Sequence, residues 1–238
     1  MCGRYANASS REELNAQFDL AWAGELSPHY NIAPSQTVAI VRLAEDGAQA
    51  GPGVQAGEAR RELAFVQWGL IPSWAKDPAI GAHLINARAE TLAEKPAFRN
   101  AWRRHHCLVP ASAFYEWKGP PGHKQPYCVR MADDALFGMA GLWERWHDPA
   151  GKVVETCTII TTDANALIAR LHDRMPLIIP RADYAAWLDS AHPRAAALIK
   201  PFPARLMRAY PVSTRVNRAS NDDAACMEPV GQGEERGE

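Results

Sequence analysis

The chain lacks the features of membrane proteins and of disulfide-stabilised proteins. Its 238 residues contain no apolar run near the ~18 residues that a membrane helix needs, and no basic-then-apolar leader opens it. The five cysteines are odd in number and scattered, without a C-x-x-C pair, which argues against a disulfide framework and a zinc site. We therefore expect a cytoplasmic protein that contains no metal.

An overall excess of positive charge is also missing, since the formal net charge is −1. Nucleic-acid binding is therefore not indicated by the total charge. The distribution is uneven, because eight basic residues stand against three acidic ones between Arg88 and Arg130. Such a stretch is usually a solvated face, and it becomes an anion-binding groove only if the fold gathers it on one side.

Composition and turn signals predict an α+β protein. Hydrophobic residues make up 47% and charged residues 22%, which is typical of a soluble globular chain with a sizeable core. Short apolar runs between Gly and Pro turns predict a curved, mostly antiparallel sheet or barrel with flanking helices. The spread of the 18 prolines favours one loop-rich domain over residues 1–228, followed by an acidic, disordered tail over 229–238. The predicted strands are 37–43, 63–68, 107–109, 113–117, 127–131, 136–143, 156–161 and 177–179.

Capping signals place the first helix. Ser9 and Ser10 precede Glu12 and Glu13 at capping-box spacing, so a helix is predicted from there to about Asp19. The Gly- and Ala-rich residues 45–61 are expected to form a long, mobile hairpin loop, and Gly-Pro-Pro-Gly at 119–122 a turn between two strands. Further helices are predicted over 96–104, 163–171, 181–189 and part of 193–198.

Cys2 is the most informative residue for chemistry. After removal of the initiator methionine, it would carry a free α-amine and a thiol on adjacent carbons. This 1,2-aminothiol condenses with an aldehyde to a Schiff base, and the thiol then closes a thiazolidine on the same carbon. An α-amine titrates near ~7.7–8.0 and a thiol near ~8.5, so both groups are expected to be partly nucleophilic at neutral pH. The alternative is that a cysteine at this position is accidental, and is buried or acetylated.

Glu116 lies between aromatic residues, in the sequence Phe-Tyr-Glu-Trp at 114–117. If the segment is a strand, Glu116 alternates with Tyr115 and Trp117. A carboxylate that faces an apolar pocket has a raised pKa, which suits a general acid or base. In the alternative, Glu116 faces solvent on an edge strand.

His172 follows a predicted helix, and Pro176 disfavours helix at Met175, so His172 is expected in a loop. With Asp173 and Arg174 beside it, it could shuttle protons near neutral pH. Alternatively, it is a surface histidine that caps the helix.

Asn86 and Arg88 follow the apolar pair at 84–85. The Asn amide could orient an amine or a carbonyl, and the Arg could hold a phosphate, although a turn Asn and a solvated Arg would look the same. Among the aromatics, we expect Trp68 in the core and Trp74 exposed, where it could stack on a base.

Several short motifs, in order along most of the chain, resemble the SOS-response-associated peptidase (SRAP) family, also called abasic-site processing proteins. Each motif alone is weak, and their ordered sum is specific. The loop 45–61 and the acidic tail have no counterpart in this pattern. The matching motifs are MCGRY at 1–5, YNIAP at 30–34, WGLIPSW at 68–74, INARAET at 85–91, FR at 98–99, CLVPA at 107–111, FYEW at 114–117, AGLW at 140–143, TIIT at 158–161 and HDRMP at 172–176.

The resemblance implies an SRAP-like fold and a covalent chemistry on DNA. The mature N-terminal cysteine would cross-link to abasic sites in single-stranded DNA through a thiazolidine, with self-catalysed Met1 removal and weak AP-lyase activity as further implied activities. Cys2 would be the nucleophile and Asn86 would orient its α-amine. Glu116 would assist proton transfer during ring opening and Schiff-base formation, and His172 would act mainly in reversal. The implied DNA-binding residues are Arg4, Trp74, Arg88, Thr161 and Arg174.

Three functions therefore compete at this stage. The first is covalent shielding of abasic single-stranded DNA by a monomer that needs no metal or organic cofactor and joins the nucleoid when bound. The second is an N-terminal-nucleophile peptidase, with Cys2 attacking amides and His172 or Glu116 as base. The third is a non-covalent single-stranded DNA-binding module in which Cys2 is incidental.

Overall fold

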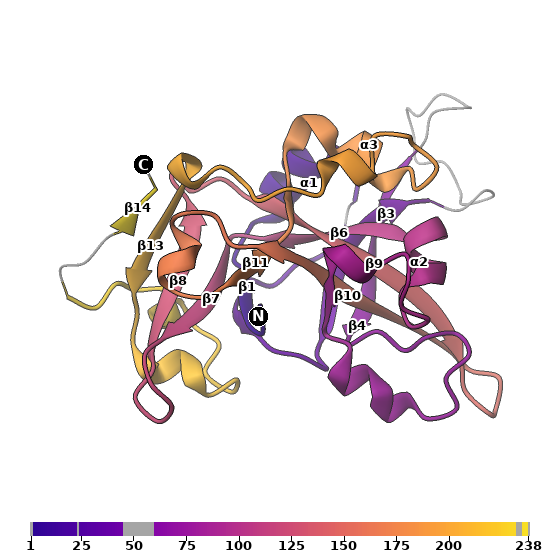
Figure 1. The fold of residues 1–238 in the computed structure, drawn as a ribbon, viewed down its shortest axis with the longest axis horizontal. Helices are drawn as coiled ribbons and strands as arrows, with labels where there is room; N and C mark the ends of the chain where they lie inside the picture. Colours follow the sequence, from indigo (N-terminus) through magenta and orange to yellow (C-terminus); the bar gives the residue numbers. More distant parts are fainter. Residues whose placement is uncertain (1, 23, 45–59, 232–234, 238) are drawn as a thin grey trace.

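Two β-sheets organise the protein in a computed structural model that describes residues 2–22, 24–44, 60–231 and 235–237 (Figure 1). Most of the predicted loop 45–61 lies outside the described residues. The first sheet has six strands, all antiparallel, in the order β14-β13-β8-β7-β1-β2. Their bounds are Glu235–Arg236, Met207–Pro211, Gln125–Met131, Ala113–Lys118, Tyr5–Asn7 and His29–Ile32.

The second sheet closes into a five-stranded barrel in the order β10-β4-β3-β6-β9. Closure occurs because β9 pairs back onto β10 from Val153↔His147 to Ile159↔Gly141. Only the pairings of β10 with β4 and with β5 are parallel among the described strands, so the mostly antiparallel prediction is confirmed. The bounds of β10, β4, β3, β6 and β9 are Val153–Asp163, Arg61–Trp68, Thr37–Leu43, His106–Ala111 and Phe137–His147, and those of the added strands β5, β11 and β12 are Asn86–Arg88, Arg174–Pro176 and Ile178–Ile179.

One hydrophobic cluster joins the two sheets. It takes alternate residues from all five barrel strands and continues onto the inner face of the six-stranded sheet. Such sharing fills the barrel and fixes the two sheets against each other, because interiors pack at near-crystal density. Representative members are Ile40, Val66, Cys107, Met139 and Cys157 from the barrel, and Tyr5, Phe114 and Val129 from the sheet.

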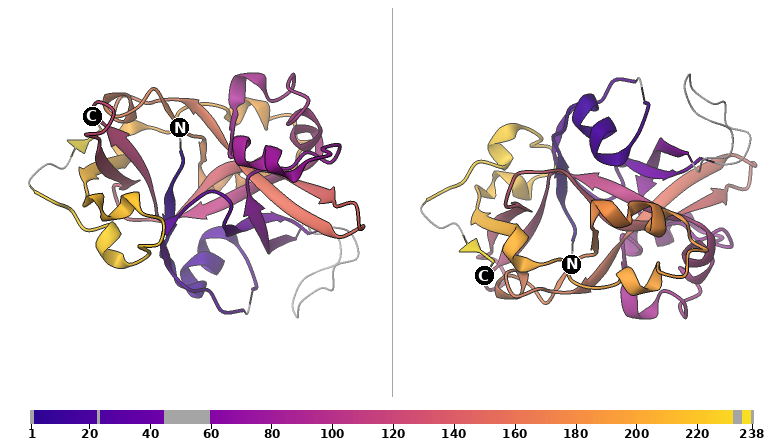
Figure 2. Two further views of the ribbon diagram at one scale, coloured as in Figure 1. Left: turned by 90° about the horizontal axis from the view of Figure 1, so that it is seen from below. Right: turned by 90° about the horizontal axis from the view of Figure 1, so that it is seen from above.

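Three α-helices of the described residues cover the outside of the barrel (Figures 1 and 2). In α1 (Arg11–Phe18), Ser10 and Glu13 form the predicted capping box, and Leu14 and Phe18 are buried. The predictions for 96–104 and 181–189 are confirmed in shortened form, as α2 (Arg99–Arg104) and α3 (Tyr184–Leu188).

The helix predicted over 163–171 is wrong. The ladder of β10 continues to Asp163, and only a 3₁₀ turn at Ile168–Arg170 follows before β11. Asn165 explains the short turn, since its Oδ1 accepts from the backbone N–H groups of Leu167 and Ile168 at 3.1 and 2.9 Å. The part predicted helical in 193–198 is likewise a 3₁₀ turn, Ala196–Leu198.

Within the predicted disordered tail, Glu235–Arg236 form β14 against β13, and the boundary between domain and tail at residue 228 stays a prediction. Sequence patterns also missed β1, β2, β5 and β13. These strands are short, and what fixes each is a partner far along the chain, such as Phe114 for Tyr5. Local alternation carries little information over three to five residues.

Candidate active site at the N-terminus

The N-terminal segment lies between the two sheets, with β7 and β8 on one side and the barrel on the other (Figures 1 and 2). It enters along β7, where Tyr5 pairs with Phe114 and the Tyr115 N–H donates to the Arg4 carbonyl at 3.0 Å. Extending this antiparallel register by two residues from the Tyr5–Phe114 pair places Gly3 opposite Glu116. Cys2 therefore lies near Glu116, whose charge acts on its thiol.

Cys2 is fully buried in this structure and belongs to the shared hydrophobic cluster. Burial, and secondly the negative charge of Glu116, raise the pKa of its thiol to about 12. The expectation of a partly ionised thiol is therefore wrong for this structure, because a thiol with such a pKa is neutral near pH 7. A neutral thiol is a weak nucleophile, so Cys2 needs a neighbouring base or a change in its surroundings to react.

Asn86 contacts the main chain of Cys2. It lies on β5, which pairs in parallel with β10 at Ile159, so the alternative of a turn asparagine is excluded. Its Nδ2 donates to the Cys2 carbonyl at 2.8 Å. Its Oδ1 is buried, and no hydrogen-bond partner for it exists among the described residues. The amide therefore holds the Cys2 backbone with its donor and leaves its acceptor available.

Glu116 is buried and 3% exposed, on an interior strand between β1 and β8. The alternative of a solvent-facing carboxylate on an edge strand is excluded. Burial raises the pKa of its carboxyl, while the charge of His172 acts in the opposite direction. Because Glu116 also acts on the Cys2 thiol, these three side chains lie within electrostatic reach of one another.

The raised pKa of Glu116 makes stability depend on pH. The folded state keeps the proton of Glu116 up to a higher pH than the unfolded chain, where a Glu titrates near ~4.3. Its contribution is therefore present below that value and lost as pH rises through the folded pKa. We expect Glu116→Gln to gain stability relative to the unmodified protein between pH 4 and 8, measured by urea unfolding. The exposed Glu94→Gln is the control, and a flat difference for Glu116→Gln would contradict the expectation.

His172 lies in a loop between the 3₁₀ turn Ile168–Arg170 and β11, as predicted. Its Nδ1 is 3.0 Å from the backbone N of Arg174 and 2.7 Å from Oδ1 of Asp173. These two contacts need different protonation states. An Nδ1 without a proton accepts from the Arg174 N–H, and the neutral ring then carries its proton on Nε2; a protonated Nδ1 donates to Asp173.

Of the implied DNA-binding residues, two are well exposed. Arg88 lies at the end of β5, two residues beyond Asn86, and Trp74 is 57% exposed with its indole N–H directed to the Pro96 carbonyl at 3.3 Å. Thr161 is fully buried, paired with Arg88 across β5 and β10. Trp68 is 1% exposed. The predicted burial of Trp68 and the predicted exposure of Trp74 are therefore confirmed.

Arg4 already has structural partners. Its Nη1 donates to Oδ1 of Asn31 at 2.8 Å and to the carbonyl of Val216 at 2.7 Å, and burial lowers its pKa. These contacts tie the N-terminal segment to β2 and to the C-terminal part of the chain. The implied phosphate contact of Arg4 remains a prediction, and the structure adds an anchoring role for it.

Arg174 also forms ion pairs and hydrogen bonds with other residues of the protein. Its two terminal nitrogens donate to both oxygens of Glu90 at 2.8 and 2.9 Å, to Asp163 at 2.7 Å and to the Thr161 carbonyl at 2.7 Å. The side chain is 9% exposed, while both carboxylates are well exposed. This network pins β11 to the end of β10 and to the turn after β5, so it stabilises the loop that carries His172.

We expect Arg174→Met to lower the free energy of unfolding by about 2 kcal/mol, because it removes several charge-assisted hydrogen bonds, although the two carboxylate partners stay solvated. Chemical denaturation measures the loss. Arg88→Met is the control, since Arg88 is exposed and its replacement should leave stability nearly unchanged. Equal stabilities of the two variants would show that the Arg174 network is dispensable.

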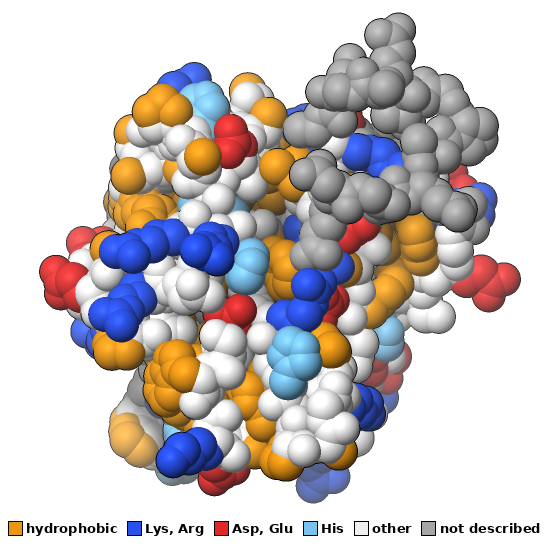
Figure 3. Space-filling model, turned by 90° about the vertical axis from the view of Figure 1, so that its right-hand side faces the viewer, with side chains coloured by type: hydrophobic (Ala, Val, Ile, Leu, Met, Phe, Trp, Pro, Cys, Tyr) orange, Lys and Arg blue, Asp and Glu red, His pale blue; other side chains and the backbone are white. Residues whose placement is uncertain are grey.

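The basic segment 88–130 is divided by the fold. Arg99, Arg103 and Arg104 lie on α2, whereas Lys118 and Lys124 lie at the β7–β8 hairpin on the other side of the molecule (Figure 1). On the face that Figure 3 shows, Lys and Arg side chains stand in separate groups with apolar and acidic side chains between them. Sequence clustering therefore does not yield one basic groove in this region.

A model of the SOS response associated peptidase (SRAP) family matches residues 1–219, which is most of the chain. The chain belongs to the SRAP family. The Bacillus subtilis "Abasic site processing protein YoqW" is 40% identical over 235 residues, covering 96% of this chain and 99% of that protein. The Gallus gallus "Abasic site processing protein HMCES" is 32% identical, covering 87% of this chain and 68% of that protein.

A solved structure has a similar fold. This structural-genomics protein from Bacteroides thetaiotaomicron superposes with a TM-score of 0.81 at 26% identity, covering 96% of this chain and all of that one. The α+β fold with a curved sheet or barrel, predicted from composition and turn signals, is confirmed.

Sequence reasoning missed Asn31 as a structural residue of this SRAP chain. Its Nδ2 donates to the carbonyls of Val216, Arg218 and Asn221, and its Oδ1 accepts from Arg4. Asn31 lies in one of the SRAP motifs, but the positions it bonds are about 190 residues away, which no local pattern reveals.

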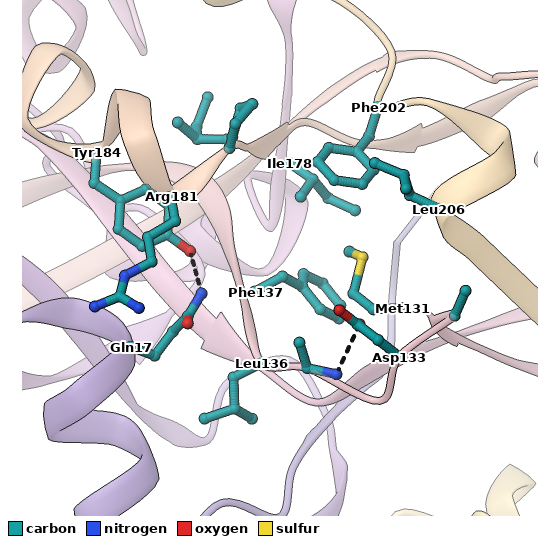
Figure 4. A pocket seen from close by; sticks show the side chains of 14 residues that line it. Gln17, Met131, Asp133, Leu136, Phe137, Ile178, Arg181, Tyr184, Phe202 and Leu206 are labelled. Atoms are coloured by element: carbon teal, nitrogen blue, oxygen red, sulfur yellow. Dashed lines mark hydrogen bonds between the residues drawn. The ribbon is translucent and has the colours of Figure 1, made fainter.

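A separate cavity of about 220 Å³ lies between β12, α3 and the segment near Leu206 (Figure 4). Its lining is mainly apolar, with Phe137, Ile178 and Phe202 facing inward and Gln17 bonded to the Tyr184 hydroxyl at 3.3 Å. None of the nine predicted site residues lines it. The predicted site and this cavity are therefore separate places on the molecule.

Two absences hold for the described part of the chain. No group of three or more His, Cys, Asp and Glu side chains is placed to hold a metal ion there. None of its helices is long and apolar enough to cross a membrane.

Proposed function

We propose that this SRAP protein processes abasic sites by cross-linking Cys2, after loss of Met1, to the ring-opened sugar in single-stranded DNA. The observation that carries the proposal is the convergence of Asn86 and Glu116 on Cys2, with His172 in electrostatic reach. An abasic site is a latent aldehyde, and an aminothiol traps aldehydes. The names of the two relatives, as abasic site processing proteins, support the same kind of substrate.

The first step forms the Schiff base. Loss of Met1 frees the α-amine of Cys2, whose carbonyl Asn86 holds through Nδ2, while the buried Oδ1 of Asn86 can accept from the new amine. The amine nitrogen attacks the sugar aldehyde carbon and passes one of its protons to the aldehyde oxygen. A second proton lets that oxygen leave as water, and the Schiff base that remains is protonated on nitrogen. Glu116 supplies a proton, because its raised pKa keeps it protonated at higher pH than an ordinary carboxyl.

The second step closes the ring. The Cys2 sulfur bonds to the imine carbon, the C=N electron pair returns to nitrogen, and the thiol proton passes to the carboxylate that Glu116 has become. The balance is one aldehyde and one aminothiol giving one thiazolidine and one water. A thiol whose pKa is about 12 needs such a base. This order, with the amine first and the thiol second, follows from the burial of Cys2. The positive charge of the protonated Schiff base next to the thiol also favours the thiolate.

His172 handles protons at the outer side of the site. While its Nδ1 accepts from the Arg174 N–H, the proton of the neutral ring is on Nε2, which makes His172 a donor toward the sugar. Protonating the ring nitrogen of the thiazolidine or the sugar oxygen favours reopening. We therefore assign His172 mainly to reversal.

Arg88 and Trp74 are the proposed DNA contacts, because both are exposed. An arginine contributes a salt-dependent phosphate contact, and an indole replaces lost base stacking. We expect Trp74→Ala to weaken binding to abasic single-stranded DNA by about 5- to 150-fold, matching ~1–3 kcal/mol per stacked base. Fluorescence anisotropy measures it. Phe65→Ala removes an aromatic that is 50% exposed on β4 and is the control; equal affinities of the two variants would remove Trp74 from the interface.

The experiment that tests the proposal is adduct formation on a denaturing gel. The protein is incubated with single-stranded DNA that carries one abasic site, then heated. A heat-resistant adduct is expected, and none with a tetrahydrofuran analogue of the site, which has no latent aldehyde. An equal yield with the analogue would contradict thiazolidine chemistry. Cleavage of a peptide that needs Cys2, without any DNA adduct, would favour the peptidase function instead.

A further inference from the structure

We infer that Trp68 is a positioning residue for the proposed cross-linking reaction: its indole fixes Asn86 and the N-terminal segment relative to each other. The inference rests on the proposed function and extends it to a side chain in the core. Trp68 ends β4 and is 1% exposed, so it touches neither solvent nor DNA. Its indole contacts both segments that form the proposed site, the strand that carries Asn86 and the N-terminal strand.

The first contact is a hydrogen bond to the strand that carries Asn86. Nε1 of Trp68 donates to the carbonyl of Ile85 at 2.9 Å, and Ile85 directly precedes Asn86. The same carbonyl accepts from the N–H of Ile159 at 3.1 Å, in the β5–β10 pairing. The hydrogen bond from Ile159 sets the position of β5 along β10. The hydrogen bond from the Trp68 indole adds a second restraint on β5 that comes from β4. Asn86 then reaches the Cys2 carbonyl at 2.8 Å.

The second contact is with the N-terminal strand. The ring of Trp68 meets that of Tyr5 edge-on, with centroids 5.4 Å apart and planes at 69°. Tyr5 is 1% exposed and lies three residues after Cys2. One rigid side chain thus packs against the segment that presents the thiol and bonds the segment that holds its carbonyl.

The backbone of Trp68 is held in place by two hydrogen bonds, so its indole can fix the position of its neighbours. Its backbone N–H donates to the Gln36 carbonyl at 2.9 Å, and its carbonyl accepts from the Ser35 N–H at 2.8 Å. Filling the core does not need the indole nitrogen, since a buried N–H adds an obligation to find an acceptor. Here that acceptor is the residue beside Asn86.

Loss of the indole N–H should therefore slow the chemistry more than it harms the fold. Small misplacements of reacting groups can cost up to ~10²-fold in rate. For Trp68→Phe, which keeps an aromatic ring and removes the donor, we expect the maximal rate of adduct formation at saturating DNA to fall about tenfold. The Kd for abasic DNA should stay unchanged, because Trp68 is away from the surface.

The matched control is Trp187→Phe. Trp187 is equally buried, and its Nε1 donates to the Cys107 carbonyl at 2.8 Å, but it belongs to the cluster under the helices, which does not include Cys2. Both variants replace a buried bicyclic indole by a single ring and lose one hydrogen bond to the backbone, so their melting temperatures should fall similarly. Only Trp68→Phe should slow the adduct. Equal rates in the two variants would overturn the inference.

Two further measurements keep the test decisive. Benzothienylalanine at position 68 keeps the bicyclic ring and removes only the N–H, and it replaces Trp68→Phe if that variant does not fold. The side-chain amide resonances of Asn86 should shift with the change at position 68 and not with Trp187→Phe. If the unmodified protein forms no adduct, the proposed function fails, whereas an adduct with unshifted Asn86 resonances and an unchanged rate refutes the role of Trp68 alone.

Discussion

Cys2→Ala protein forms no heat-resistant adduct with abasic single-stranded DNA, on the mechanism proposed above, and still binds that DNA reversibly. The variant keeps an α-amine after Met1 removal but has no thiol, so the reaction can reach the Schiff base and cannot close the thiazolidine. Borohydride should therefore trap a reduced adduct with Cys2→Ala, although none survives heating without it. The loss is complete because no other group supplies the ring sulfur at the same carbon.

The matched control is another buried cysteine. Cys128 is fully buried in a cluster that does not include Cys2, and Cys128→Ala should keep the heat-resistant adduct. A heat-resistant adduct with Cys2→Ala would contradict the account, since attachment would then not need the thiol. Loss of adduct in both variants would point to general destabilisation.

Glu116→Gln is expected to slow adduct formation about a hundredfold, within the ~10²–10⁴ that a positioned acid–base group contributes. Glutamine keeps the size of the side chain and cannot donate or accept the proton that each proposed step moves. His172→Ala should form the adduct at a rate close to that of the unmodified protein and release it more slowly. Single-turnover rates, and the transfer of adduct to an excess of fresh abasic DNA, measure the two directions separately.

The pH dependence distinguishes this role of Glu116 from a merely structural one. Its carboxyl is protonated at higher pH than usual because it is buried. The forward rate should decline as pH rises through that pKa if proton donation limits the reaction, and Glu116→Gln should lack this limb of the profile. Equal forward and reverse rates in Glu116→Gln and His172→Ala would refute the two assignments.

The sequence predicted the strong local patterns well. The strand 37–43 and the capped helix after Ser10 are confirmed, because alternation over seven residues and a capping box are local signals. The helix predicted over 163–171 is wrong because β10 pairs with β11 as far as Asp163, and tertiary pairing overrides a short helical pattern. The closure of the barrel by β9 and β10 could not be predicted from periodicity, since pairing partners leave no local trace.

For the site, residue types were easier to predict than their environments. The motifs singled out Cys2, Asn86, Glu116 and His172, and the structure brings the first three together with His172 in reach. The burial of Cys2 was only an alternative in the sequence, and it changes the chemistry, because a thiol expected near its ordinary pKa has its pKa raised to about 12. The resemblance implied DNA contacts for Arg4 and Arg174, and these stay predictions, while the structure shows that both also have partners within the protein.

The intact mass of the purified protein, before and after exposure to abasic single-stranded DNA, tests the central claim most directly. The account predicts a protein lighter than its full sequence by one methionine residue. After reaction, it predicts a species heavier by the oligonucleotide less one water. A protein that keeps Met1, or carries an acyl group on its amine, and gains no mass from the DNA would contradict the account.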